Sequence, residues 1–208
     1  MRRGSIVVAG GIVVCAAGAR ADIVVWNETI HGDISGDRLN PSTVALSPGV
    51  NALIATSNTG DREYIRMTVP AGLNLAAIMH VTWQSEDPIA FIGVQAGPTF
   101  TEPPTGTNVA NLLGWTHFGS GPGTVGFDVL PAISTGAGAI GFTPPLAANT
   151  YTFWIQQTGP ALATYRLDFI VAPSPGTAMF GLLMLGLTPR RRSSRIKRPV
   201  RAAAGAIP

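Results

Sequence analysis

The chain has 208 residues, enough for one ordinary domain with short appendages, and its 46% hydrophobic content excludes a disordered protein. Its formal net charge is +3, but residues 22–189 hold four basic residues against eleven acidic ones, which gives this body a net charge of −7. An acidic body disfavours binding to phosphate groups, so a nucleic-acid partner is excluded although the two ends of the chain are basic.

Residues 1–21 have the features of a secretory signal peptide. A short positive region is followed by an apolar stretch, and Ala19-x-Ala21 offers a cleavage site directly before Asp22. We expect a signal helix outside the fold and a mature protein that begins at Asp22 and lacks the only cysteine, Cys15. A twin-arginine signal and a lipoprotein site at Cys15 are weaker alternatives, because the residues that normally surround those motifs are missing.

The segment HGDISGDRLNPS, residues 31–42, contains the best candidate for a metal site. Asp33, Ser35 and Asp37 alternate, so a tight loop would direct three oxygen atoms at one cation, and hard oxygen ligands suit calcium. The full EF-hand pattern is absent, because no glutamate stands at its last position. Asp and Ser side chains also cap turns, so Asx-turns explain the same pattern without a metal.

Period-two alternation between clusters of turn-forming residues predicts β-strands along the body. Such strands, without a long helical pattern, predict an all-β fold: an antiparallel, jelly-roll-like β-sandwich over residues 22–172. Arg166 and Asp168 should point outward from the last strand. The residues expected to share the faces of their strands are Ile65, Met67 and Val69; Leu75, Ala77, Met79, Val81 and Trp83; Tyr151, Phe153 and Ile155; and Tyr165, Leu167, Phe169 and Val171.

The section 97–148 differs from the rest of the body, because it is rich in turns and carries only short apolar runs. We expect long loops between short strands there. In the run GWTHFG, Trp115 and His117 share one side of a short strand, which makes them a candidate binding surface; an ordinary half-buried aromatic pair is the alternative. His80 is expected on the strand face away from Trp83, where it is either solvated or satisfied by local contacts.

No catalytic motif is present in the sequence. Neither the zinc signature H-E-x-x-H nor the nucleophile elbow G-x-S-x-G occurs. We therefore expect a protein without enzymatic activity and without a cofactor other than the calcium considered above. A secreted hydrolase whose active site is assembled from distant residues is the alternative from another class.

Two stretches of the body, GDREYIRMTVPAG and LAANTYTFWIQQTGPALATYRLDFIV, resemble the bacterial pre-peptidase C-terminal domain. The shared features are an Asp-x-x-Tyr strand that ends in V-P-A-G and a late pair of strands. The resemblance covers the first third and the last quarter of the body, and the middle section is longer than in the family. It implies a jelly-roll-like β-sandwich, a non-catalytic role in an exported protein and, in some members, binding of calcium or extracellular polymers.

Residues 173–208 have the order of a sorting signal. A motif at 173–176 precedes an apolar run, 177–187, and a basic tail, 190–208. As a helix, the residues from 175 to 187 rise about 20 Å, which is short of the ~30 Å of bilayer hydrocarbon. We expect a short hydrophobic helix outside the fold, held at the inner membrane only transiently, with the basic tail on the cytoplasmic side.

This order is similar to the PEP-CTERM sorting signal of bacteria that make extracellular polysaccharide. In that family a membrane enzyme of the transpeptidase kind, the exosortase, recognises the signal. The chain departs from the family in having Ser174 in place of the glutamate and in its longer tail. The residues that carry the resemblance are Pro173, Pro175, Gly176, the run FGLLMLGL, and Arg190, Arg191 and Arg192.

The sequence therefore predicts an exported, exosortase-sorted β-sandwich protein of the cell surface or the extracellular polysaccharide matrix. Its expected partners are the export machinery, the exosortase, the inner membrane during sorting, and extracellular polysaccharide. A secreted calcium- or glycan-binding module is the alternative reading.

Overall fold

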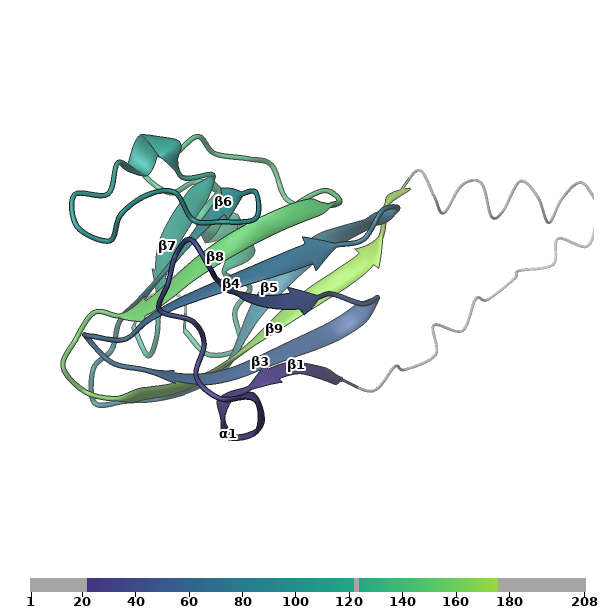
Figure 1. Ribbon diagram of the computed structural model, residues 1–208. Coiled ribbons are helices and arrows are strands. Elements are labelled where there is room, and N and C mark those ends of the chain that lie inside the picture. The colour runs from purple at the N-terminus through teal and green to yellow at the C-terminus, as the bar shows by residue number, and fades with distance from the viewer. Residues whose placement is uncertain (1–21, 122–123, 176–208) are drawn as a thin grey trace, which may run out of the picture. The chain divides into compact units, whose positions relative to one another are not determined.

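The computed structural model describes residues 22–121 and 124–175, which form two β-sheets packed face to face (Figure 1). One sheet has four strands in the order β1-β3-β9-β5, and the other has five in the order β2-β4-β8-β6-β7. The expected all-β sandwich is therefore present. Its strands are β1 (Ile23–Asn27), β2 (Ser42–Ala45), β3 (Gly49–Ser57), β4 (Arg62–Val69), β5 (Leu73–Gln84), β6 (Ala90–Ala96), β7 (Gly114–Phe118), β8 (Asn149–Gln157) and β9 (Ala163–Pro173), and its short helices are α1 (Glu28–His31), η1 (Val109–Asn111) and α2 (Leu130–Ser134).

The core lies between the sheets and consists of the alternating apolar residues of the strands. Ile65 and Met67 of β4 and Leu167 of β9 are completely buried there. Phe153 of the five-stranded sheet and Phe169 of the four-stranded sheet meet across the core, with ring centroids 5.3 Å apart. Burying each such side chain contributes about 1.5–3 kcal/mol, which is why the alternation in β4, β8 and β9 determines the register of these strands.

Strand β5 contradicts the expected alternation. Its register against β9 shifts between Leu75 and Ala77 and again between His80 and Thr82. Each β-bulge adds one residue to β5, so the side chains that follow it point to the opposite face. Leu75, Ile78, His80 and Trp83 consequently face the core, whereas Ala77 and Met79 face outward. The placement of His80 on the face away from Trp83 is wrong, and so is its exposure to solvent, because the side chain is completely buried against Trp83 and Phe118.

Pairing at one side of the sandwich also differs from the purely antiparallel expectation. The edge strands β1 and β2 run parallel to β3 and β4, respectively. Parallel neighbours need a long crossover connection. The chain provides this connection by passing from β1 in one sheet to β2 in the other sheet and back to β3 in the first. Each edge strand therefore precedes its parallel neighbour in the sequence, with a strand of the other sheet between them.

The section 97–148 contains one short strand, β7, and two short helices, η1 and α2, between long loops. Helix α2 contacts both β5 and β7, which are edge strands of the two sheets, and buries Leu130 and Ile133. The chain before and after α2 lies along β5, where Met79 bridges to Asp128 and Leu75 bridges to Leu146. This section therefore closes the side of the sandwich opposite β1 and β2.

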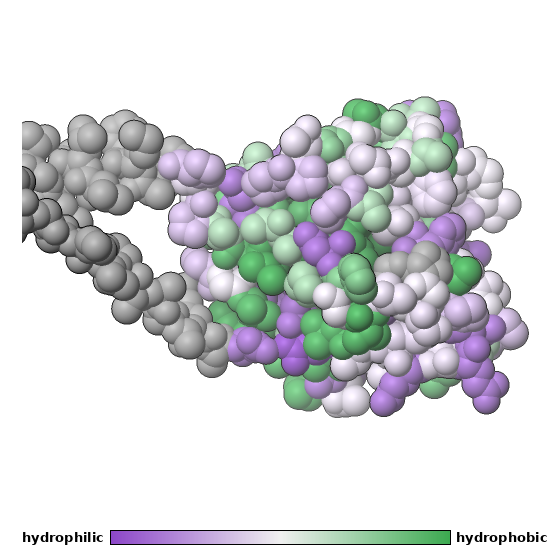
Figure 2. Space-filling view, turned by 180° about the vertical axis from the view of Figure 1, so that it is seen from behind, coloured by the Kyte–Doolittle hydropathy of each residue, from purple (hydrophilic) through white to green (hydrophobic). Residues whose placement is uncertain are grey.

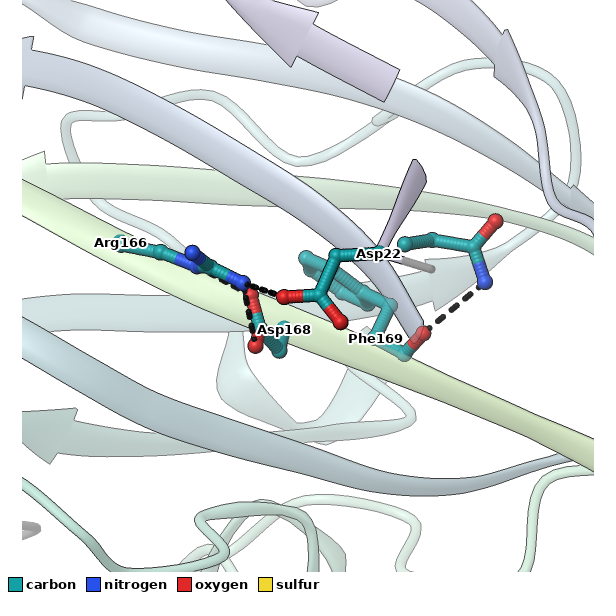
Figure 3. A network of polar contacts seen from close by, with 5 residues as sticks. Asp22, Arg166, Asp168 and Phe169 are labelled. Carbon is teal, nitrogen blue, oxygen red and sulfur yellow. Dashed lines mark hydrogen bonds and ion pairs between the residues drawn. The ribbon is translucent and has the colours of Figure 1, made fainter. Parts of the chain in front are cut away.

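The start of β1 and the end of β9 lie toward the same end of the sandwich (Figure 1). Arg166, within β9, connects this strand to the residue before β1, because its guanidinium contacts the carboxylate of Asp22 at 2.6 Å and that of Asp168 at 2.7 Å (Figure 3). Both Arg166 and Asp168 lie on the outer face of β9, as predicted. These two ion pairs raise the pKa of Arg166 still further above its ordinary value.

The described body continues slightly beyond the predicted boundary at residue 172. Pro173 pairs with Leu73, and Ser174 donates hydrogen bonds from its backbone nitrogen to the Gly72 carbonyl and from Oγ to Asn74 Oδ1, both at 2.9 Å. The chain divides into two compact units after Ser174. The signal peptide with Ala19 and Ala21, Gly176 of the sorting motif, the apolar run 177–187 and the basic tail with Arg190, Arg191 and Arg192 lie outside the described residues.

Candidate functional site

The outer face of the five-stranded sheet is partly covered by an aromatic cluster. Tyr64 of β4 and Trp154 of β8 are directly opposite each other in the strand register. Phe100, from the loop after β6, packs on both rings, with centroids 5.7 Å from each. With Leu112 these residues form a second buried cluster outside the main core, which we call the covered cluster. The alternation of the strands directs the side chains of Tyr64 and Trp154 outward from the core. The loop that carries Phe100 nevertheless buries them.

Beyond the covered cluster, four side chains form a row that crosses the sheet. Arg62 of β4 pairs with Gln156 of β8, Gln156 pairs with Phe91 of β6, and Phe91 pairs with His117 of β7. The pleat directs all four to the outer face, because their strand neighbours point into the core. Each of the four is only partly buried. We call these residues the outer row.

The ring of Phe91 lies at the centre of this face. A Cβ atom added at Gly93 would come within 2.8 Å of the Phe91 ring, so the ring covers the backbone of the glycine and needs its lack of a side chain. Trp115 stacks beside Phe91 at 6.1 Å with an interplanar angle of 27°, and His117 meets Phe91 edge-on at 6.2 Å. The predicted pair Trp115 and His117 is therefore part of a larger group of rings.

Trp115 is held in place from the loop after α2. Its indole Nε1 donates a hydrogen bond to the Ala137 carbonyl at 3.0 Å, and Gly136 packs against its backbone. Trp115 and His117 also contact each other edge-on, with centroids 5.6 Å apart. Both side chains are partly buried, so the half-buried aromatic pair that the sequence analysis offered as an alternative is also a feature of this surface.

Several polar groups on this face have no partner among the described residues. They are Nε of Arg62, the hydroxyl of Tyr64 and Nε1 of Trp154, which are buried and form no hydrogen bond within residues 22–121 and 124–175. Burial raises the pKa of Tyr64 to about 12, although Arg62 and Arg38 oppose this effect. Unpaired buried polar groups are rare in folded proteins, so three of them on two neighbouring strands mark this face as unusual.

The face also carries most of the positive charge of the described body. Arg38 donates to the carbonyls of Phe100 and Thr101, and Arg66 donates to Thr43 and Pro98. Neither they nor Arg62 forms an ion pair within the part of the chain that the structure describes, where both ion pairs belong to Arg166. Three of the four arginines of the body therefore lie on one face without a carboxylate partner.

Four carboxyl groups gather near the start of β4: those of Glu28, Asp33, Asp61 and Glu63, which we call the acidic cluster. Glu28 at the start of α1 accepts hydrogen bonds from the backbone of Ile34 and from Thr56. Glu63 is completely buried and accepts a hydrogen bond from the hydroxyl of Tyr165. The other carboxyl oxygen of Glu63, Oε1, is buried and forms no hydrogen bond within residues 22–121 and 124–175.

Burial and mutual repulsion favour the protonated forms in this cluster. Burial raises the pKa of Glu63 well above its ordinary value, and the charges of Glu28, Asp61 and Asp33 raise it further. Burial and the charges of Asp33 and Glu28 raise the pKa of Asp61 to about 6. The cluster therefore takes up protons at a pH at which most carboxylates are ionised.

Two of the three predicted calcium ligands, Ser35 and Asp37, form hydrogen bonds that stabilise turns. Ser35 Oγ donates to the Asn40 carbonyl and accepts from the backbone nitrogen of Asp37, while Asp37 Oδ1 accepts from the backbone of Leu39. Asp33 contributes instead to the acidic cluster. Within residues 22–121 and 124–175, no group of three or more His, Cys, Asp or Glu side chains is arranged to hold a metal ion. Calcium at Asp33, Ser35 and Asp37 stays a prediction.

Hydrophobic residues also reach the surface on the side turned away from the viewer of Figure 1, where hydrophilic residues interrupt them (Figure 2). The most exposed large hydrophobic side chains of the described body include Ile30, Phe127 and Ile140. No helix among the described residues is long and apolar enough to cross a membrane. The chain matches no family model, no curated protein and no solved structure.

Sequence reasoning did not identify Arg62, Phe91, Gln156 or Glu63. Glu63 had a visible signal, because it stands in phase with Ile65 and Met67 and alternation therefore places its carboxylate in the core. Apart from His117, the outer row had none, since its members come from four strands whose register is fixed only by the fold.

Proposed function

We propose that this protein is exported, processed at both ends and sorted to the cell surface or the extracellular polysaccharide matrix, where it acts without enzymatic activity. The signal peptide brings the chain to the export machinery. The PEP-CTERM-like segment holds it at the inner membrane until an exosortase removes the apolar run and the basic tail.

The observation that carries this proposal is the agreement between the signals and the limits of the folded body. Strand β1 begins at Ile23, one residue after the expected new N-terminus, and β9 ends at Pro173, where the sorting motif begins. Removal of both ends would therefore leave every strand of the sandwich in place. The jelly-roll-like topology, the terminal helices and the relationship to the pre-peptidase C-terminal domain belong to this proposal and rest on the sequence resemblances.

The proposal is tested by intact-mass measurement on cell fractions of a bacterium that makes an exosortase. We expect a surface or extracellular species that begins at Asp22 and lacks residues 177–208. Deletion of the exosortase should leave the tail on the protein and the protein with the inner membrane. A matched variant with Arg190, Arg191 and Arg192 changed to glutamine should be processed less efficiently. Recovery of the intact tail on released protein, or of the whole chain in the cytoplasm, would contradict the proposal.

A further inference from the structure

We propose that the outer row, together with Trp115, binds a polysaccharide chain that carries carboxylate groups. This inference rests on the proposed function, because it assigns a ligand and a site to a protein of the polysaccharide matrix. It is carried by the geometry of one face of the five-stranded sheet.

The rings supply a fixed stacking surface. Sugar rings present faces of C–H groups, and aromatic rings bind apolar faces best when their own orientation is fixed beforehand. Phe91 is fixed in this way, since its ring covers Gly93 and contacts Trp154 with centroids 4.7 Å apart. The other side of the Phe91 ring is partly exposed and lies next to the Trp115 ring, and the two ring planes differ by 27°.

Polar groups flank the rings on both sides along the row. The amide nitrogen of Gln156 donates to the Thr59 carbonyl at 3.0 Å, which orients the amide and leaves its oxygen as an acceptor. His117 at the other end provides ring nitrogens that form no hydrogen bond with residues 22–121 or 124–175. An amide and an imidazole on either side of an aromatic ring suit a ligand whose hydroxyl groups surround an apolar face.

Arg62 favours a ligand that carries negative charge. Its guanidinium makes neither a hydrogen bond nor an ion pair with the described residues, and its Nε is buried. An arginine offers a planar fork of donors that matches a carboxylate, and leaving such donors unpaired is costly. Arg38 and Arg66 add positive charge to the same face. A carboxylate of the polysaccharide is therefore favoured here although the body as a whole is acidic.

The row has the length of a chain-binding surface rather than of a single-sugar site. Its four residues lie on four adjacent strands, and neighbouring strands are about 4.8 Å apart, so the row extends for about 14 Å. Such a surface would bind a stretch of polymer and would bind it more tightly when several proteins engage the same chain.

The inference is tested with the full-length chain purified in mild detergent, by native electrophoresis in gels that contain polygalacturonate or, separately, the neutral glucan dextran. We expect polygalacturonate to retard the protein, dextran to retard it much less, and added salt to weaken the retardation. Arg62→Gln, Phe91→Ala and Gln156→Ala should each lower the affinity, the first two by at least about tenfold. Arg62→Lys, which keeps the charge and loses the planar fork, should fall between Arg62→Gln and the wild type.

Gln84→Ala is the matched control, because Gln84 is an exposed glutamine on the outer face of the other sheet, and its affinity should be unchanged. Thermal melting of each variant shows whether it is folded. If Phe91→Ala unfolds, the partly exposed Arg62 and Gln156 still decide the question. Absence of retardation, equal retardation by dextran, or variants of Arg62 and Gln156 that bind like the wild type would overturn the assignment. Because localisation and processing are measured separately, failure here would leave the proposed function standing.

Discussion

Raising the pH from about 5 to about 8 should destabilise the folded body through the acidic cluster. Burial raises the pKa of Glu63 and of Asp61, the latter from 3.8 to about 6. A carboxyl group whose pKa is raised by folding stabilises the fold fully below its unfolded pKa. That contribution is lost as the pH rises through the folded pKa. Stability should therefore fall from about pH 4 until the pH passes the folded pKa of Asp61 at about 6, and it should continue to fall above that as long as Glu63 stays protonated in the folded state.

The size of the effect can be worked out from Asp61. Each unit of pKa shift corresponds to about 1.36 kcal/mol, but Asp61 is partly exposed and solvent screening reduces its share. We expect the cluster to cost about 1–2 kcal/mol at neutral pH, which for a domain of about 150 residues lowers the melting midpoint by about 3–6 °C.

Differential scanning calorimetry at constant ionic strength, in buffers with EDTA, measures this change. Glu63→Gln keeps an oxygen acceptor for Tyr165 and removes the ionisable group, so it should flatten the pH dependence and raise the midpoint at alkaline pH. Glu86→Gln, at an exposed position between β5 and β6, is the control. A wild-type midpoint that rises across this range, or a Glu63→Gln variant with the wild-type slope, would refute the reasoning.

Three further predictions concern other parts of the body. Mass spectrometry of exported protein should find Asp22 at the N-terminus, whereas Met1 or a lipid on Cys15 would contradict the signal-peptide reading. If Asp33, Ser35 and Asp37 bind calcium, millimolar Ca²⁺ should raise the melting midpoint by several degrees over EDTA, and Asp33→Ala with Asp37→Ala should remove the difference; equal wild-type midpoints would exclude the site. Gly114→Ala should cost about 1–3 kcal/mol in urea unfolding, because its Cβ would lie 2.2 Å from the Ile133 carbonyl oxygen, whereas Gly121→Ala should be neutral.

The strands that the sequence predicted correctly are those whose alternation is unbroken. In β4, β8 and β9 the apolar residues that alternate over 65–69, 151–155 and 165–171 all face the core, so pattern and packing agree there. In β5 the pattern is equally regular, yet a bulge after Leu75 reverses which residues face the core and a second bulge after His80 restores the original phase. A bulge is set by the pairing with β9, which no local pattern in β5 contains.

The candidate site was predictable only in part for a related reason. Trp115 and His117 share a strand, so their common side could be read from spacing. Their relation to Phe91 and Gln156 depends on a strand order, β8-β6-β7, in which β8 enters from the far end of the sequence. The burial of Tyr64 likewise depends on Phe100, which reaches it from a loop.

The end of the folded body provides the last prediction, which concerns chains that stop at Ala172 or at Pro175. The sequence placed the boundary at 172, because Pro173 cannot donate to a continuing ladder. In the structure Pro173 still pairs with Leu73, and Ser174 makes two hydrogen bonds to the loop before β5.

Each of these hydrogen bonds contributes about 0.5–1.5 kcal/mol net, so the chain that ends at Ala172 should melt several degrees below the one that ends at Pro175. Ser174→Ala in the longer chain should account for the part of the difference that belongs to the Oγ contact with Asn74. Both chains should be released from the membrane, since both lack the apolar run. Equal midpoints would show that the body ends at Ala172. A lower midpoint would mean that Ser174 contributes to the fold, so that an exosortase, if it acts on this chain as proposed above, would have to approach a motif that is hydrogen-bonded to the body.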